Sequence, residues 1–297
     1  MQLKFCFGQR TTALTTSPVE LRLSLQNPLI AGSGEETWQL PSLDYAGADA
    51  YGIHRWQNEK GFCLAVIAPV TQPSIREISR SLYARLIEAL GDQHFYRIWN
   101  FIPLINESYG TLDTYKLFCL GRAEALEALH DAALPAASAV GTPGSHLAII
   151  AIGGTAQTRP VENPLQVPAW RYPEQYGPRS PSFARATSVD ERELFVSGTA
   201  SIRQSESLHD GDVLAQCTLT AENIDLVIRS ASLPESDKVN PMTTSRVYLR
   251  HPADWSIIEQ EVRRHLEPDE GSLNVIQAEV CRPELLVEAE THLRTRG

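Results

Sequence analysis

Apolar residues recur along this chain with two different spacings, and each spacing predicts a different element. Alternating apolar positions, or short apolar runs between turn residues, predict strands, whereas apolar residues three and four apart predict helices. In the first half the predicted strands are Leu3–Phe7, Val19–Leu25, Tyr51–Trp56, Gly61–Ala68, His94–Pro103 and His146–Ile152. Helical spacing is found over Pro73–Leu90 and Leu112–Leu129. Asn27–Tyr45, which contains Gly-Ser-Gly, is expected to be a loop.

The second half of the chain repeats this order of strands and helices. Helices are predicted over Asp212–Arg229 and Pro252–Leu266. The predicted strands are Glu193–Ser201, Thr243–Arg250, Leu273–Val280 and Glu284–Glu290. Gly153–Pro168 is polar and rich in Pro and Gly, and is expected to connect the two halves. The pattern therefore predicts an α+β fold of two units, residues 1–158 and 159–297, each with helices packed on one face of a mixed sheet.

Composition narrows the class of protein. The chain has 297 residues, of which 42% are hydrophobic and 21% charged, as expected for a packed globular protein. Its net charge of -10 gives no long-range attraction for nucleic acid or anionic membranes, and no stretch has the length of a membrane span. The first ten residues are too polar for a signal peptide. Five scattered cysteines without a C-x-x-C motif suit a reducing cytoplasm.

Several well-known sites are absent from the sequence. It has no H-E-x-x-H motif, no phosphate-binding G-x-x-x-x-G-K-[ST] and no G-x-S-x-G, which argues against a zinc hydrolase, a P-loop enzyme and a serine hydrolase of the usual type. Gly32-Ser33-Gly34 lacks the third glycine and the strand-to-helix turn of a dinucleotide site. No metal site is therefore predicted.

The stretch from Trp170 to His209 is the first candidate for a binding site. Its prolines and glycines make a stiff loop, on which Tyr176, Arg179 and Arg185 could direct donors toward an anion. The small-residue segment Ser197–Ser201 that follows lets backbone N–H groups approach a ligand. The alternative is a surface loop that leads into a buried strand.

The C-terminal segment Val280–Glu290 is the second candidate. Alternation places Glu288 and Glu290 on one side of a strand that is otherwise apolar. If Glu288 is buried, loss of hydration raises its pKa toward the range that suits a general acid. The alternative is an edge strand on which both glutamates face water.

Three spaced motifs resemble the chorismatase family over most of the chain. They are W-x-Y-P-x-x-Y-G-P-R-x-P-x-F-x-R-A at residues 170–186, SGTASI at 197–202, and the C-terminal CRPELLVEAE. The resemblance implies two RidA-like domains, the first degenerate and the second catalytic, and no metal or organic cofactor. It also implies cleavage of the enolpyruvyl ether of chorismate with release of pyruvate, after an acidic side chain protonates the terminal methylene.

The resemblance also implies roles for individual residues. Glu288 matches the family's acid, and Cys281 matches a position that is Cys in the subgroup that makes 3-hydroxybenzoate. The residues implied in substrate binding are Tyr176, Arg179 and Arg246 for the two carboxylates, Gly198, Thr199 and Ala200 near the ring, and Tyr115 and Arg122 from the first domain.

The product and two rival functions stay open at this point. The product could be 3-hydroxybenzoate, a mixture with 4-hydroxybenzoate, or the unaromatised dihydroxycyclohexadiene carboxylate. The rivals are a RidA-type enamine/imine deaminase and a non-catalytic binding module; Gly271–Val280 lacks the arginine that the deaminases use. A chain that contains two such units is expected to complete its own pocket and to work as a monomer.

Overall fold

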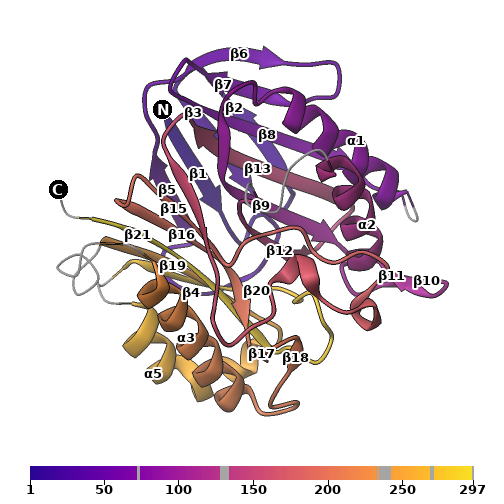
Figure 1. Cartoon of the computed structure of the whole chain (residues 1–297), viewed down its shortest axis with the longest axis vertical. Helices are drawn as coiled ribbons and strands as arrows, with labels where there is room; N and C mark the ends of the chain where they lie inside the picture. The colour runs from indigo at the N-terminus through magenta and orange to yellow at the C-terminus, as the bar shows by residue number, and fades with distance from the viewer. Residues whose placement is uncertain (72–73, 128–133, 232, 234–241, 268–270, 296–297) are drawn as a thin grey trace.

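In a computed structural model of the chain, residues 1–71, 74–127, 134–231, 233, 242–267 and 271–295 are described. They form layers, with three sheets inside and helices on the two outer faces (Figure 1). The first sheet has six strands, in the order β12 (Ala136–Thr142), β9 (His94–Pro103), β13 (His146–Gly154), β8 (Gly61–Pro69), β7 (His54–Gln57) and β6 (Asp44–Ala48). It is mixed, because β12 runs parallel to β9 while β9, β13 and β8 are antiparallel. Helices α1 (Ile75–Glu88) and α2 (Thr114–Leu126) pack on one of its faces.

The second sheet has seven strands and lies beside the first. In order, these are β14 (Thr158–Val161), β15 (Ala186–Val189), β16 (Glu193–Ala200), β21 (Val287–Arg294), β19 (Met242–Leu249), β20 (Leu273–Gln277) and β4 (Leu29–Ala31). Its outer face is covered by α3 (Val213–Ser230) and α5 (Trp255–Leu266), which share an aliphatic core with the strands. Because β16 and β19 both pair with β21, the last strand of the chain is central and buried.

A third, smaller sheet of the order β2 (Ala13–Thr16), β3 (Glu20–Ser24), β1 (Gln2–Cys6) and β5 (Glu35–Gln39) closes the space between the two larger ones. Its residues belong to the same buried cluster as the inward-facing residues of both larger sheets. The contacts are largely aromatic; the ring centroids of Phe5 and Trp99, for example, lie 5.2 Å apart. This central core joins segments from both ends of the chain.

The α+β fold with helices on one face of each mixed sheet is confirmed. Strand β9 has the predicted bounds. Each end of α3 lies one residue from the predicted helix Asp212–Arg229, and α5 lies inside the predicted helix Pro252–Leu266. Pro73 and residues 128–129, at the ends of two predicted helices, lie outside the described residues. The division at residues 158 and 159 stays a prediction, since β4 from the first half adds to the sheet of the second half.

Two sequence predictions were wrong, and one strand was not predicted. Asn27–Tyr45 is not a loop, because it contains β4 and β5 and the start of β6. The polar residues of β5 obscured the alternation that predicts a strand. One of them, Glu36, is buried and forms an ion pair with Arg246. The supposed connector Gly153–Pro168 contains β14. Strand β12 was missed because its sequence, AASAVGT, consists of small residues without a clear alternation.

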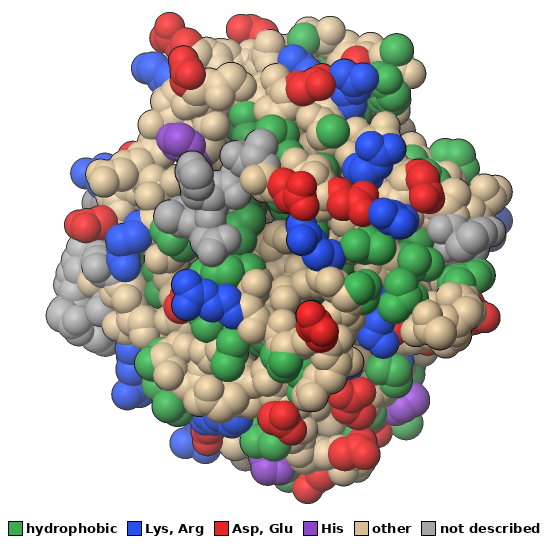
Figure 2. Space-filling view, turned by 45° about the vertical axis from the view of Figure 1, so that its right-hand side comes forward, with side chains coloured by type: hydrophobic (Ala, Val, Ile, Leu, Met, Phe, Trp, Pro, Cys, Tyr) green, Lys and Arg blue, Asp and Glu red, His purple; other side chains and the backbone are tan. Residues whose placement is uncertain are grey.

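The exterior carries charges of both signs. On the face shown in Figure 2, basic and acidic side chains are interspersed rather than segregated into broad patches of one sign. None of the helices in the described ranges has an apolar stretch of the length that crossing a bilayer requires.

Helices α1 and α2 approach each other closely at Gly121. A Cβ atom on this residue would lie 2.0 Å from the carbonyl oxygen of Arg76 and 2.3 Å from Oγ of Ser79, so neither helix could keep its place. The glycine therefore fixes how deeply α2 sits over the sheet.

We expect Gly121→Ala to lower the free energy of unfolding by about 1–3 kcal/mol, the usual effect of overpacking. The measurement is equilibrium unfolding in urea. At an exposed helical position the same substitution would raise stability by up to about 1 kcal/mol; a gain of that kind would contradict the close contact with Arg76.

Candidate active site

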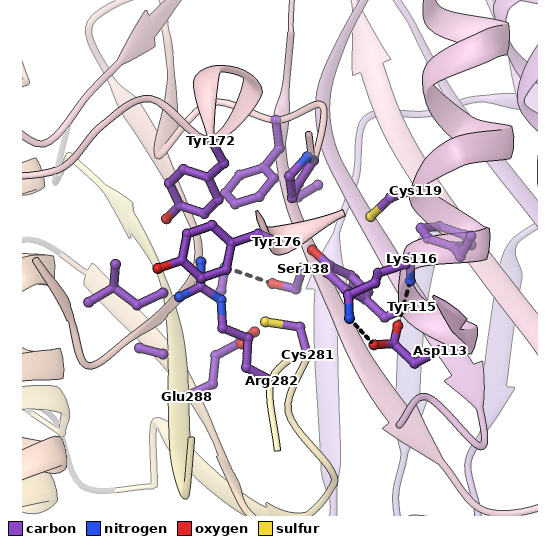
Figure 3. Close-up of a pocket in the computed structure, with 18 of the residues that line it drawn as sticks. Asp113, Tyr115, Lys116, Cys119, Ser138, Tyr172, Tyr176, Cys281, Arg282 and Glu288 are labelled. Carbon is purple, nitrogen blue, oxygen red and sulfur yellow. Dashed lines mark hydrogen bonds and ion pairs between the residues drawn. The ribbon is translucent and has the colours of Figure 1, made fainter. Parts of the chain in front are cut away.

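A cavity of about 170 Å³ lies between the two larger sheets, where the edge strand β12 meets β16 and β21. From the first half of the chain, α2 and β12 line one side of it. From the second half, β16, β21, the loop before β15 and the loop before β21 line the other side (Figure 3). Residues more than a hundred positions apart thus face one another across a small space.

Glu288 on β21 lies at the inner end of this cavity and is only 4% exposed. Within the described residues no hydrogen-bond donor contacts its carboxyl group. Oε1 of Glu288 lies against Gly198 of β16, so close that a Cβ atom on residue 198 would be only 2.0 Å from it. Burial, followed by the nearby charge of Glu290, raises the pKa of Glu288 to about 8. The side chain therefore keeps its proton at neutral pH, as a general acid must.

Glu290, two residues farther along the same strand, has the opposite surroundings. Burial alone would raise its pKa, but the charges of Arg97 and Arg246 outweigh burial and lower it. Nη2 of Arg97 lies 2.7 Å from Oε2 of Glu290, and Nε1 of Trp99 donates to Oε1 at 2.9 Å. One strand therefore carries a neutral and an ionised carboxyl group side by side.

Three arginines that line the cavity each have at least one buried nitrogen without a hydrogen-bond partner in the described residues. Arg122 on α2 is buried; its Nε and Nη2 have no hydrogen-bond partner in the described residues, and its guanidinium lies 4.9 Å above the ring of Tyr83. Nε of Arg185 and Nη2 of Arg282 are likewise buried and unpaired. Buried guanidinium nitrogens without acceptors are costly, so three such groups around one cavity favour an anionic ligand.

Two of these arginines are held by the loop 169–185, which contains the short helical turns η2 (Ala169–Arg171) and η3 (Glu174–Tyr176). Nη2 of Arg185 donates to the hydroxyl of Tyr172 at 2.6 Å. The guanidinium of Arg282 lies 3.8 Å above the ring of Tyr176. This loop therefore orients the basic groups as well as lining the cavity (Figure 3).

The sulfur and phenol groups of the cavity are neutral. Burial, and then the proximity of Glu288, raises the pKa of Cys281 to about 12. Burial raises the pKa of Tyr115 well above its usual range and that of Cys119 to about 12. These side chains are a thiol, a phenol and a thiol at neutral pH, so none of them is an anionic nucleophile.

Eight of the residues singled out from the sequence line the cavity. They are Tyr115, Arg122, Tyr176, Arg185, Gly198, Ala200, Cys281 and Glu288. The alternative interpretation of Glu288 and Glu290 as water-facing residues of an edge strand is wrong, because β21 is central and both are buried.

Three others lie elsewhere. Arg179 is largely exposed and pairs with Glu127 at the surface. Arg246 is buried beneath the cavity, between Glu36 and Glu290. Thr199 turns away from the cavity, as alternation along β16 requires, and its hydroxyl donates to the carbonyl of Ser197.

Sequence reasoning missed Arg282 and Ser138 and left Arg185 as one basic residue among several. A signal existed for Arg282, which follows Cys281 directly within a motif. No signal existed for Ser138, because its strand β12 was not predicted. Its hydroxyl accepts a hydrogen bond from the N–H of Gly198 at 2.9 Å and donates one to Glu290.

Known proteins resemble this chain in sequence. A family profile described as chorismatase FkbO/Hyg5-like, N-terminal, matches residues 36–153. A 3-hydroxybenzoate synthase from Streptomyces hygroscopicus is 36% identical over 293 residues, which covers 91% of this chain and 84% of the relative. A chorismatase from Streptomyces rapamycinicus is 37% identical over 219 residues, or 69% of this chain and 65% of the relative.

A solved structure has the same fold. The crystal structure of a chorismatase superposes with a TM-score of 0.84 at 23% sequence identity, and the match covers 98% of this chain and 92% of the other. The sequence match to the synthase covers 91% of the chain. The chain therefore belongs to the chorismatase family.

Proposed function

We propose that this protein cleaves chorismate to pyruvate and 3-hydroxybenzoate, with Glu288 as the general acid. The observation that carries the proposal is a carboxyl group that keeps its proton at neutral pH in a buried cavity lined by three arginines. The relative that matches 91% of the chain bears the name 3-hydroxybenzoate synthase, which supports the choice of product.

The arginines account for binding of the substrate. Chorismate is a dianion, and its two carboxylates match the guanidinium groups of Arg122, Arg185 and Arg282, each of which lines the cavity and keeps at least one N–H group without an acceptor. Tyr176 fixes Arg282 by stacking, and Gly198 leaves room for the substrate next to Glu288. A chain of net charge -10 needs such local positive groups to hold an anion.

The reaction begins with transfer of the Glu288 proton to the terminal methylene of the enolpyruvyl group. Protonation of this carbon makes an oxocarbenium-like centre at the carbon that bears the ether oxygen. The carboxylate that Glu288 becomes is then a negative charge beside that cation, in a site with little water to screen it. In the route without net water, the neighbouring ring hydroxyl oxygen displaces the ether oxygen at its ring carbon, and that carbon–oxygen bond breaks with its electron pair on the ether oxygen, which leaves as the keto oxygen of pyruvate. The hydroxyl proton returns to the Glu288 carboxylate, and opening of the resulting ring epoxide with loss of a ring proton gives the hydroxybenzoate.

Atom balance bears on the product. Together, 3-hydroxybenzoate and pyruvate contain all the atoms of chorismate, so the reaction consumes no water. The dihydroxycyclohexadiene carboxylate requires one water molecule per turnover. The small, buried cavity with a neutral thiol at Cys281 favours the reaction without net water.

Glu288→Gln keeps the shape of the side chain and removes its acidic proton. We expect pyruvate release from chorismate to fall by at least about a hundredfold, the usual size of a general acid's contribution. The assay couples pyruvate to its reduction by NADH and is run with and without a chelator. Wild-type turnover by this variant would contradict the acid role, and absence of turnover by the wild-type protein would contradict the function.

We expect kcat/KM to fall as the pH rises through about 8. An acid is active only while protonated, and the pKa of Glu288 is about 8. We therefore expect kcat/KM to be constant below that pH and to fall about tenfold per unit above it. A profile that instead rises through pH 8 would mean that Glu288 acts as a base.

Cys281→Ala tests the control of the product. We expect total pyruvate release to change less than threefold, because the thiol is not the acid, while the aromatic product shifts away from 3-hydroxybenzoate. Chromatography of the acids formed from chorismate gives the ratio. Cys119→Ala is the matched control, since Cys119 is a second buried thiol on the opposite wall of the cavity. An unchanged ratio in the Cys281 variant would exclude the assigned role.

A further inference from the structure

Glu288 and Glu290 point to the same face of β21, and only Glu290 is surrounded by donors. We propose that Glu290 is a positioning residue for the reaction: its fixed negative charge keeps the proton on Glu288, and through Ser138 it holds Gly198 against the Glu288 carboxyl. This inference rests on the proposed acid role of Glu288.

The charge of Glu290 is fixed by donors from three strands. Its Oε1 lies 3.1 Å from Nη1 of Arg246, and its Oε2 accepts a hydrogen bond from the hydroxyl of Tyr248 at 3.0 Å. Trp99 and Arg97 of β9 and Ser138 of β12 donate as well. Five donors, two of them cationic, stabilise the carboxylate form of Glu290 over the carboxylic acid.

The charges of this buried network balance without Glu288. Arg246 pairs with Glu36 of β5, with Nε 3.1 Å from Oε2 and Nη2 2.9 Å from Oε1. Arg97 pairs with Glu290 at 2.7 Å. Two buried guanidinium groups thus face two buried carboxylates, so an ionised Glu288 would add a further negative charge close to Glu290 in a region of low dielectric.

Other groups also face Glu288 from the elements packed against it. Arg97 of β9 and Arg185, just before β15, act against the proton, while burial and Glu290 act for it. Cys281 and Tyr115, which face the same carboxyl from the loop before β21 and from α2, are neutral. Glu288 retains its proton because burial and the charge of Glu290 together raise its pKa by more than the two arginines lower it.

Ser138 connects Glu290 to the geometry of the acid. Its hydroxyl donates to Oε2 of Glu290, so its lone pairs are free to accept from Arg97 and from the N–H of Gly198. Gly198 lies at the irregularity in the pairing of β16 with β21, between Val196 and Thr199. That position brings the backbone against the Glu288 carboxyl. Glu290 therefore acts on Glu288 both through its charge and through this contact.

The test is Glu290→Gln, which keeps the shape and removes the charge. We expect the alkaline fall of kcat/KM to move to lower pH by about one unit, because the charge that opposes ionisation of Glu288 is lost. The matched control is Glu193→Gln. It removes a carboxylate of β16 that pairs with His292 and Arg294 of β21, away from the cavity. It should lower stability and leave the pH profile in place. An unmoved profile in the Glu290 variant, or an equal shift in both, overturns the inference.

A second measurement uses the wild-type protein, so it does not depend on folding of the variant. With glutamate labelled with carbon-13 at the carboxyl group, NMR follows each titration, and Glu288→Gln identifies the Glu288 signal. We expect Glu290 to stay ionised from pH 5 to 9 while Glu288 loses its proton near 8. A protonated Glu290 beside an ionised Glu288 at pH 6 overturns the inference. This readout needs no turnover, so failure of the proposed function and failure of the role of Glu290 are distinguishable.

Discussion

The architecture depends on keeping two carboxyl groups on one buried strand in different charge states. A second uncompensated charge in this interior would cost several kcal/mol, so the protein assigns the ionised state to one group and the neutral state to the other. Hydrogen-bond donors surround the Glu290 carboxylate, whereas in the described residues none contacts the Glu288 carboxyl group. The contrast needs strands from both halves of the chain, because Arg97 comes from the first sheet and Arg246 from the second.

The close approach of the two halves follows from small residues at their junction. Strand β12 is made largely of alanine, glycine and serine, so its free edge can lie against β15 and β16. The N–H of Ala136 donates to the hydroxyl of Thr187 at 2.7 Å, and that of Ala137 donates to the hydroxyl of Ser197 at 2.9 Å. Side-chain oxygens thus satisfy an edge that would otherwise carry unpaired backbone groups, and the cavity forms beside that seam.

Anion binding in this acidic protein is a local property. The overall charge repels anions, yet Arg122, Arg185 and Arg282 converge at the cavity with donors unpaired. Aromatic rings orient them: Tyr83 lies under Arg122, and Tyr172 and Tyr176 contact the other two. Stacking on a ring face holds a guanidinium in place without using its N–H groups; the hydroxyl of Tyr172 accepts one hydrogen bond from Arg185, while Nε of that arginine stays without an acceptor.

The sequence by itself determined the elements with strong periodicity, such as β9 and α3, the α+β class, and the position of Glu288 within an apolar strand. These depend on local spacing, which the residues display directly. Only the tertiary structure decided which arginines face the cavity. Nothing in the local sequence distinguishes Arg246 from Arg282. Arg246, however, forms an ion pair with Glu36, 210 residues away, and does not line the cavity. The environment of a charge is set by partners distant along the chain, and no local pattern records them.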